Sequence, residues 1–266
     1  MKKYFLNILI AFTLIITHNA NAITDGQFDG DTHPAVVLIL MEVDGVPVFR
    51  CSGTLISPTF VLTAGHCTGA PGEFSGLRVF TESDVQNGDN SYPYKGPNTV
   101  EVKRWASHPD YPYYPFFIND VGMIELEEPI ELAIDQYASL PPVDILDSFA
   151  RRRGLDNIYF TAVGYGLQQI NPVFVESELI RMVAYPHLIQ INAPGMTGSF
   201  SMLLSNNHST GGTCFGDSGG PNFIGNSLTI AGVTSFGLNG NCAGTGGVFR
   251  LDRKNVLDFI SGFMNK

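Results

Sequence analysis

The chain has 266 residues, of which 44% are hydrophobic and 15% are charged, and it contains 29 glycines and 16 prolines. This length and apolar content allow one large domain or two smaller ones with a sizeable core, and they exclude an intrinsically disordered chain. The formal net charge of −10 argues against a nucleic acid or an anionic membrane as a partner.

Residues 1–22 have the pattern of a signal peptide. Lys2 and Lys3 precede the mostly apolar residues 4–16, and Ala20-Asn21-Ala22 has the small-x-small pattern of a signal-peptidase site. An uncleaved membrane anchor is the alternative, but the apolar run is short for a spanning helix. We therefore expect cleavage after Ala22 and a secreted protein, extracellular or periplasmic. Loss of two lysines and no acid takes the net charge from −10 to −12.

From Ile23 onward the chain has the pattern of short β-strands separated by turn-rich stretches. The first group of expected strands is 35–42, 48–49, 51–56, 60–64, 77–81, 99–102 and 121–126. The second group is 159–164, 177–184, 223–224, 228–236 and 247–251. Leu140-Pro141-Pro142 marks a connector between them, so we divide the chain at about residue 140.

The one clear helical pattern is at 254–264, where Val256, Phe259, Ile260 and Phe263 have helical spacing. Asp252 is expected to cap its start. Many strands and a single C-terminal helix indicate an all-β fold, a barrel or a sandwich, and not a parallel α/β sheet.

Four cysteines follow the signal segment: Cys51, Cys67, Cys214 and Cys242. An even number in an exported chain indicates disulfides, and three connectivities are possible. The sequence favours the local pairs Cys51–Cys67 and Cys214–Cys242. A metal site is the alternative, but the spacings contain no C-x-x-C pair, so no metal and no cofactor are expected.

Three short motifs carry residues of catalytic type, in the order His66, Asp120, Ser218. Ser218 lies in the segment GDSGGP at 216–221, where glycines let the backbone approach a substrate carbonyl. A serine hydroxyl becomes a nucleophile when a base takes its proton, and the backbone N–H groups of Gly216 and Ser218 are candidates to bind the resulting oxyanion.

The base and its partner come from the other two motifs. His66, in TAGHC, follows a buried strand and precedes Cys67, which can fix its loop. Its ordinary pKa of about 6.5 suits proton transfer near neutral pH. Asp120, in NDVGMI, directly precedes an apolar run, so it is expected to be partly buried and to orient the imidazole.

The TAGHC, NDVGMI and GDSGGP segments resemble the three signature blocks of the chymotrypsin/trypsin family of serine endopeptidases. Three further segments are similar to family patterns: CSGTLI at 51–56 to C-G-G-x-L-I, GYG at 164–166 to G-W-G, and SFG at 235–237 to S-W-G. The resemblance implies two six-stranded antiparallel β-barrels, at about 23–140 and 141–252, with the site between them. It also implies the triad roles above and supports both disulfide pairs.

The resemblance carries an expectation about activation. The family buries a newly freed N-terminus against the acid that precedes the nucleophile, which here is Asp217. The segment Ile23-Thr24-Asp25-Gly26 resembles the family's I-V-G-G start. Our hypothesis is that signal cleavage itself frees Ile23 and matures the enzyme.

The resemblance also places the first specificity pocket. It puts Gly212 at the base, Thr213 beside it, Gly237 and Gly247 on the walls, and the strand Ser235-Phe236-Gly237 along the substrate. Thr234 occupies the position at which Glu-specific relatives have a histidine. An uncharged base disfavours Arg and Lys, so the expected substrates are proteins or peptides cleaved after large apolar residues.

Two other functions remain open at this point. A catalytically dead homologue acting as a binding module is one, although all three triad residues are present. An α/β-hydrolase esterase is the other, but it would need a G-x-S-x-G elbow with the histidine last. Four acids lie in one loop region: Glu73, Glu82, Asp84 and Asp89. They would allow a calcium-binding loop, but we prefer a solvated acidic loop without an ion. A monomer is expected.

Overall fold

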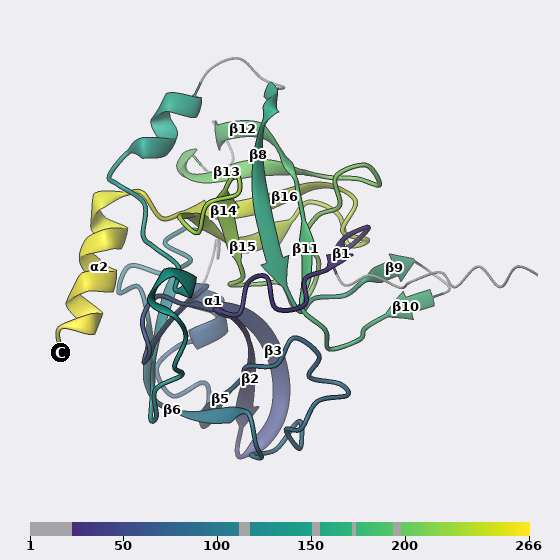
Figure 1. Ribbon diagram of the computed structural model, residues 1–266. Coiled ribbons are helices and arrows are strands. Elements are labelled where there is room, and N and C mark those ends of the chain that lie inside the picture. Colours follow the sequence, from purple (N-terminus) through teal and green to yellow (C-terminus); the bar gives the residue numbers. More distant parts are fainter. Residues whose placement is uncertain (1–22, 112–117, 151–154, 172–173, 194–197) are drawn as a thin grey trace, which may run out of the picture.

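The computed structural model describes residues 23–111, 118–150, 155–171, 174–193 and 198–266. The expected signal peptide at 1–22 therefore lies outside the described residues. Two β-barrels lie one above the other in Figure 1. Among the described residues there is no helix of the length and apolar character needed to cross a membrane.

The first barrel closes through six antiparallel strands, drawn in purple to teal in the lower half of Figure 1. Their order is β2 (Val36–Val43), β3 (Val46–Leu55), β4 (Phe60–Thr63), β7 (Gly122–Leu126), β6 (Thr99–Ser107) and β5 (Gly76–Phe80). The sequence predicted these strands. It divided β3 in two, because Val46, Val48 and Phe49 are exposed and lack the alternating pattern.

The second barrel also has six strands, and the pairing of β14 with β8 closes it. Their order is β8 (Leu155–Gly164), β12 (His187–Ala193), β13 (Gly198–Asn206), β16 (Gly244–Arg250), β15 (Ile230–Gly237) and β14 (Pro221–Ile224). The predicted fold class, two six-stranded antiparallel β-barrels, is confirmed. The sequence missed β12 and β13, whose pairing contains two register irregularities that break the period-2 pattern.

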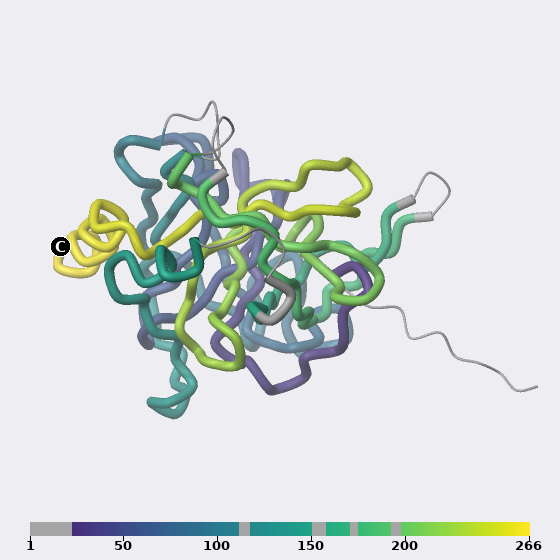
Figure 2. The backbone as a smooth tube through the Cα atoms, turned by 90° about the horizontal axis from the view of Figure 1, so that it is seen from above, coloured from purple at the N-terminus to yellow at the C-terminus, as the bar shows by residue number. Residues whose placement is uncertain are grey.

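The remaining elements lie around the barrels. The range 177–184 was predicted as one strand, but only β11 (Met182–Ala184) forms there, beside the end of β8. The hairpin of β9 (Gln169–Asn171) and β10 (Phe174–Glu176) projects from the body in both views (Figures 1 and 2). Two short 3₁₀ helices, η1 (Ile134–Gln136) and η2 (Ile145–Phe149), lie in the connector.

The first residues described depart from the expected division of the chain. The range 23–140 was assigned to the first barrel, yet β1 (Gln27–Phe28) pairs with β11 of the second. Arg181 explains this placement, because its buried guanidinium donates to Asp29 at 3.0 Å and to the Gly30 carbonyl at 2.6 Å. The N-terminal segment therefore lies beside the second barrel.

The C-terminal helix α2 (Lys254–Met264) has the predicted range and packs against the first barrel. Phe263 meets the ring of Phe60 edge to face, and the Arg104 guanidinium lies 4.0 Å above the Phe263 ring. The expected cap at Asp252 is wrong. Arg253 is the N-cap and makes no side-chain capping bond, because the carboxylate of Asp252 is buried and accepts from Arg250 and from the N–H of Leu146.

Arg181 also joins the two barrels. Its side chain is only 1% exposed and pairs with the fully buried Asp29, and it donates to the carbonyl of Val36 in β2 at 2.9 Å. We expect Arg181→Met to lower the free energy of unfolding by about 3–5 kcal/mol, since it leaves a buried carboxylate without its guanidinium. Urea unfolding followed by fluorescence measures this change.

Lys103→Ala is the control for this prediction. Lys103 is exposed and pairs with Glu125, and exposed pairs contribute about 0–1 kcal/mol. Equal losses in the two variants would contradict the role given to Arg181.

Candidate active site

A short helix and a turn of the first barrel hold His66 and Asp120 together. His66 lies in α1 (Gly65–Thr68), which is separated from the end of β4 by one residue, and Asp120 lies two residues before the start of β7. Helix and strand approach closely at Gly122, where a Cβ atom would lie 2.6 Å from Thr68 Oγ1. A glycine is therefore needed there for α1 to lie against β7.

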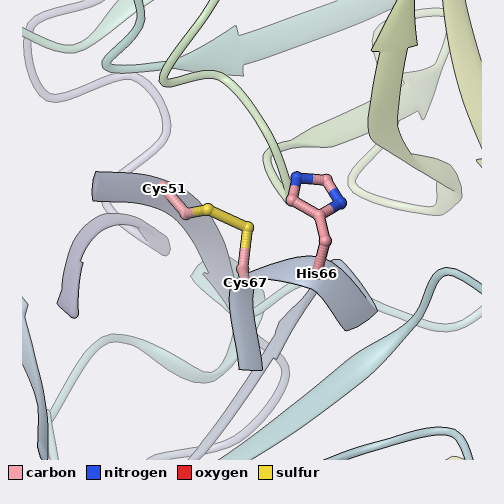
Figure 3. Close-up of side chains that lie close together, drawn as sticks. All are labelled: Cys51, His66 and Cys67. Carbon is pink, nitrogen blue, oxygen red and sulfur yellow. A yellow bond between two sulfur atoms is a disulfide. The ribbon is translucent and has the colours of Figure 1, made fainter. Parts of the chain in front are cut away.

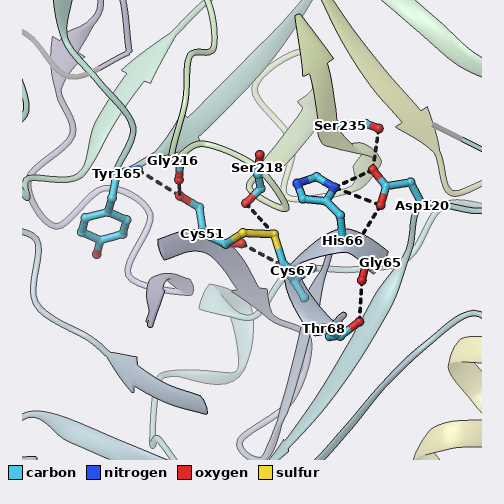
Figure 4. The surroundings of a disulfide bond; sticks show 12 residues. Cys51, Gly65, His66, Cys67, Thr68, Asp120, Tyr165, Gly216, Ser218 and Ser235 are labelled. Atoms are coloured by element: carbon cyan, nitrogen blue, oxygen red, sulfur yellow. Dashed lines mark hydrogen bonds and ion pairs between the residues drawn. A yellow bond between two sulfur atoms is a disulfide. The ribbon is translucent and has the colours of Figure 1, made fainter. Parts of the chain in front are cut away.

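Asp120 is fully buried and accepts hydrogen bonds from both barrels. Its Oδ1 accepts from the backbone N–H of His66 at 2.9 Å, and its Oδ2 lies 2.9 Å from His66 Nδ1. The hydroxyl of Ser235, from β15 of the second barrel, donates to Oδ2 at 2.5 Å (Figure 4). These contacts fix the orientation of the imidazole and leave Nδ1 as its protonated nitrogen.

The pKa of His66 is raised above its ordinary value of 6.5. Burial alone favours the neutral imidazole and would lower this pKa, but the negative charge and the hydrogen bond of Asp120 outweigh it. Asp120 thus stabilises the imidazolium that forms when His66 takes a proton.

Ser218 lies on the other side of the imidazole from Asp120 (Figure 4). Ser218 and His66 line the same cavity. The carbonyl of Ser218 accepts from the N–H of Ser52 in β3 at 2.8 Å, so the first barrel also fixes the backbone that carries this hydroxyl.

The turn before Ser218 has the properties of an anion-binding loop. Gly216 has a φ of +98°, which side chains rarely permit. In the described part of the chain, the N–H groups of Gly216 and Ser218 donate no hydrogen bond. Both donors therefore remain available to a ligand.

Asp217, between them, is fully buried. Its Oδ1 accepts from the N–H of Gly166 and its Oδ2 from the N–H of Cys214, both at 2.8 Å. Burial raises its pKa to about 7, against the opposing effect of those two N–H groups and of the charge of Arg50. A buried carboxylate of this kind would be stabilised by a nearby cation.

Ile23 is fully buried and packs with Met182 and Ala184 of β11. The next residue, Thr24, accepts a hydrogen bond at its carbonyl from the N–H of Gly212 at 3.1 Å. The segment that begins at Ile23 is therefore seated in the second barrel.

Both predicted disulfides, Cys51–Cys67 and Cys214–Cys242, are formed. Cys51, Cys67 and His66 also make a cluster of metal-ligand type within the described residues (Figure 3). A disulfide offers no thiolate to a metal, so this cluster does not fit a metal ion.

The acidic loop makes its own hydrogen bonds. Glu82 accepts from the N–H of Asp89 and from the side-chain amides of Asn90 and Asn98, and Asp84 accepts from Asn87. The fourth acid, Glu73, accepts from the N–H of Ala70 at 2.7 Å. These carboxylates therefore hold the loops together by accepting hydrogen bonds from backbone and side-chain amides.

A cavity of about 420 Å³ opens beside the triad. Four of the predicted pocket residues line it: Thr213, Ser235, Phe236 and Gly237. Thr234, which the sequence analysis compared with the histidine of Glu-specific relatives, also lines it. The sequence did not assign the other lining residues to the pocket, although they adjoin the GDSGGP and SFG segments: Cys214, Phe215, Leu238, Asn239, Gly240 and Cys242. Among the described residues that line this cavity, His66 is the one that can carry a charge.

Two residues expected in the pocket are covered by neighbours. A Cβ atom on Gly212 would lie 2.3 Å from Cγ of Asn206, and one on Gly247 would lie 2.2 Å from Cζ of Phe236. Asn206 lies in β13, a strand that the sequence did not predict, so its contact with Gly212 had no sequence signal.

The two barrels and the His66–Asp120–Ser218 site define a serine endopeptidase. The family model described as Trypsin matches residues 30–260, and the chain therefore belongs to the trypsin family.

The sequence identity to individual relatives is low. Brachyurin of Leptuca pugilator is 30% identical over 199 residues, which cover 73% of this chain and 79% of that protein. Venom serine protease Bi-VSP of Bombus ignitus is 28% identical over 228 residues, covering 80% of this chain but 59% of the relative. A solved structure of HL collagenase matches with a TM-score of 0.71 and 23% identity, over 92% of this chain and 99% of that one, which supports the fold.

The pKa of His66 gives a direct test of its contact with Asp120. In Ser218→Ala, the imidazole is expected to titrate above 6.5 by NMR, because the Asp120 carboxylate stabilises the cation. Adding Asp120→Asn removes that charge and leaves burial, so the pKa should fall below 6.5. An unchanged pKa in the double variant would mean that Asp120 does not stabilise the imidazolium.

Proposed function

We propose that this chain is a secreted endopeptidase that hydrolyses peptide bonds through an acyl-enzyme, preferentially after large apolar residues. The observation that carries the proposal is the arrangement of His66 between Ser218 and the buried Asp120 (Figure 4), at the edge of an uncharged cavity.

The proposed chemistry follows the roles established for Ser-His-Asp triads. The Ser218 hydroxyl attacks the scissile carbonyl while His66 takes its proton, and the N–H groups of Gly216 and Ser218 bind the oxyanion. His66 then gives the proton to the leaving amine, and the acyl group remains on Ser218. A water activated by His66 attacks this ester and releases the acid, while Asp120 stays ionised throughout.

The lining of the cavity supports the proposed specificity. Phe215, Phe236 and Leu238 offer apolar surface, and no Asp or Glu lies among the lining residues to pair with a basic side chain. A volume of about 420 Å³ is enough for an aromatic or long aliphatic group.

A panel of peptide p-nitroanilides tests this specificity. We expect kcat/KM with Phe, Tyr, Leu or Met before the scissile bond to exceed that with Arg or Lys by about 100-fold, since burying an unpaired cation costs several kcal/mol. A preference for Arg would reject the specificity.

Ser218→Ala is the control for the panel. It should lose about 10⁴-fold or more of kcat and all covalent labelling by a phosphonyl fluoride. Wild-type protein that is neither labelled nor active would instead identify a binding module.

We also propose that the chain matures when cleavage after Ala22 frees the amine of Ile23, which then pairs with Asp217. Two observations support this proposal: Ile23 is seated in the second barrel, and Asp217 is a buried carboxylate with a raised pKa. Cleavage by signal peptidase accords with export, as do two disulfides. We further propose that the chain acts as a monomer on protein or peptide substrates.

The pH dependence of stability tests this activation. With Asp217 at a pKa of about 7, the folded uncleaved chain holds a proton that the unfolded chain releases, so its stability falls as pH rises from about 4 to 7. In a chain that begins at Ile23, the new ammonium group should lower this pKa and reduce the fall. Urea unfolding of both forms as Ser218→Ala, between pH 4.5 and 7.5, makes the comparison.

Asp217→Asn is the matched variant, because it removes the titrating group. In this variant the free energy of unfolding should change with pH in the same way in the cleaved and the uncleaved chain. Identical pH profiles of the two forms with Asp217 intact would contradict the pairing. Mass spectrometry that finds another mature N-terminus would do so as well.

A further inference from the structure

Ser52 lies in β3 of the first barrel, directly after Cys51. It stands where the family pattern C-G-G-x-L-I has a glycine, and it is fully buried. A buried hydroxyl requires hydrogen-bond partners, and the two partners of the Ser52 hydroxyl, Tyr165 and Gly216, come from the second half of the chain.

Three hydrogen bonds connect Ser52 to the turns around Asp217. Its backbone N–H donates to the carbonyl of Ser218 at 2.8 Å. Its Oγ lies 3.0 Å from the carbonyl of Gly216 and 3.0 Å from the N–H of Tyr165. Because an amide N–H can only donate, Oγ accepts from Tyr165 and directs its own hydrogen to Gly216.

Two of the partners of Ser52 flank Asp217 on the chain. Gly216 and Ser218 lie on either side of Asp217, and both of their carbonyls accept from Ser52. Gly216 has a φ of +98°, and a glycine backbone has little torsional preference of its own. The hydroxyl bond therefore fixes the peptide plane between Gly216 and Asp217.

We propose that Ser52 is a positioning residue for the oxyanion hole, which holds the N–H groups of Gly216 and Ser218 in the orientation that the tetrahedral intermediate needs. This inference rests on the proposed endopeptidase function. Donors fixed in advance stabilise the transition state more than the bound substrate. Loss of the Ser52 hydroxyl should therefore lower kcat and leave KM nearly unchanged.

Thr54 supplies a matched control. It lies two residues further along β3 and is equally buried, but its Oγ1 has no hydrogen-bond partner within the described structure. Ser52→Ala and Thr54→Val each remove one buried hydroxyl from the same strand, and only the first removes bonds to the oxyanion loop.

The experiment compares kcat and KM of both variants on a peptide amide with an apolar residue before the scissile bond. Outright removal of an oxyanion donor lowers kcat about 100- to 1,000-fold, so loss of a bond that fixes the peptide between the two donors should lower it about 10-fold. Titration with a phosphonyl fluoride counts the competent sites, so that a poorly folded fraction does not affect kcat. Thr54→Val should remain within about twofold of wild type, because its hydroxyl makes no bond that would be lost.

Affinity for a peptide aldehyde, which forms an oxyanion on the enzyme, is the second measurement. It should weaken in Ser52→Ala by the same factor as kcat, because both report the oxyanion. An unchanged kcat per titrated site, a loss in KM instead, or an equal loss in Thr54→Val would each overturn the inference. Wild-type protein without activity would refute the endopeptidase function itself, a separate outcome.

Discussion

The contacts of the Asp120 carboxylate are the constraint on which the site depends. This fully buried group accepts from the backbone and imidazole of His66 in the first barrel and from Ser235 in the second. A buried carboxylate is costly unless its oxygens are satisfied, so the barrels must dock with Ser235 in place. The geometry that raises the pKa of His66 is thus also a condition for correct docking of the two halves.

The segment around Ser218 is held in a comparable way from the opposite barrel. Ser218 and the proposed oxyanion loop belong to the second barrel, yet Ser52 in β3 of the first bonds to that loop on both sides of Asp217. Each barrel therefore positions groups that the other carries. This exchange explains how a loop with two unbonded N–H groups can remain ordered, since preorganised donors must be supported by neighbours.

The sequence predicted what local pattern encodes. The triad motifs, the disulfide pairs, helix α2 and most of the apolar strands could be recognised from residue order alone. It failed where contacts outside the local hydrophobic pattern decide the outcome: β13 pairs irregularly with β12, Asp252 accepts from Arg250 and from Leu146 instead of capping α2, and Asn206 covers Gly212.

Each end of the described chain packs against the barrel that the opposite half of the chain forms. Strand β1 adds to β11 of the second barrel, whereas α2, which follows that barrel, packs on the first. Neither half can therefore complete its hydrophobic surface from a continuous stretch of chain. During synthesis, the face of the first barrel that α2 covers stays exposed until this last helix has been made. The slow folding that is typical of long-range β-strand pairing therefore applies to the whole molecule. Folding and unfolding should accordingly involve both barrels as one cooperative unit.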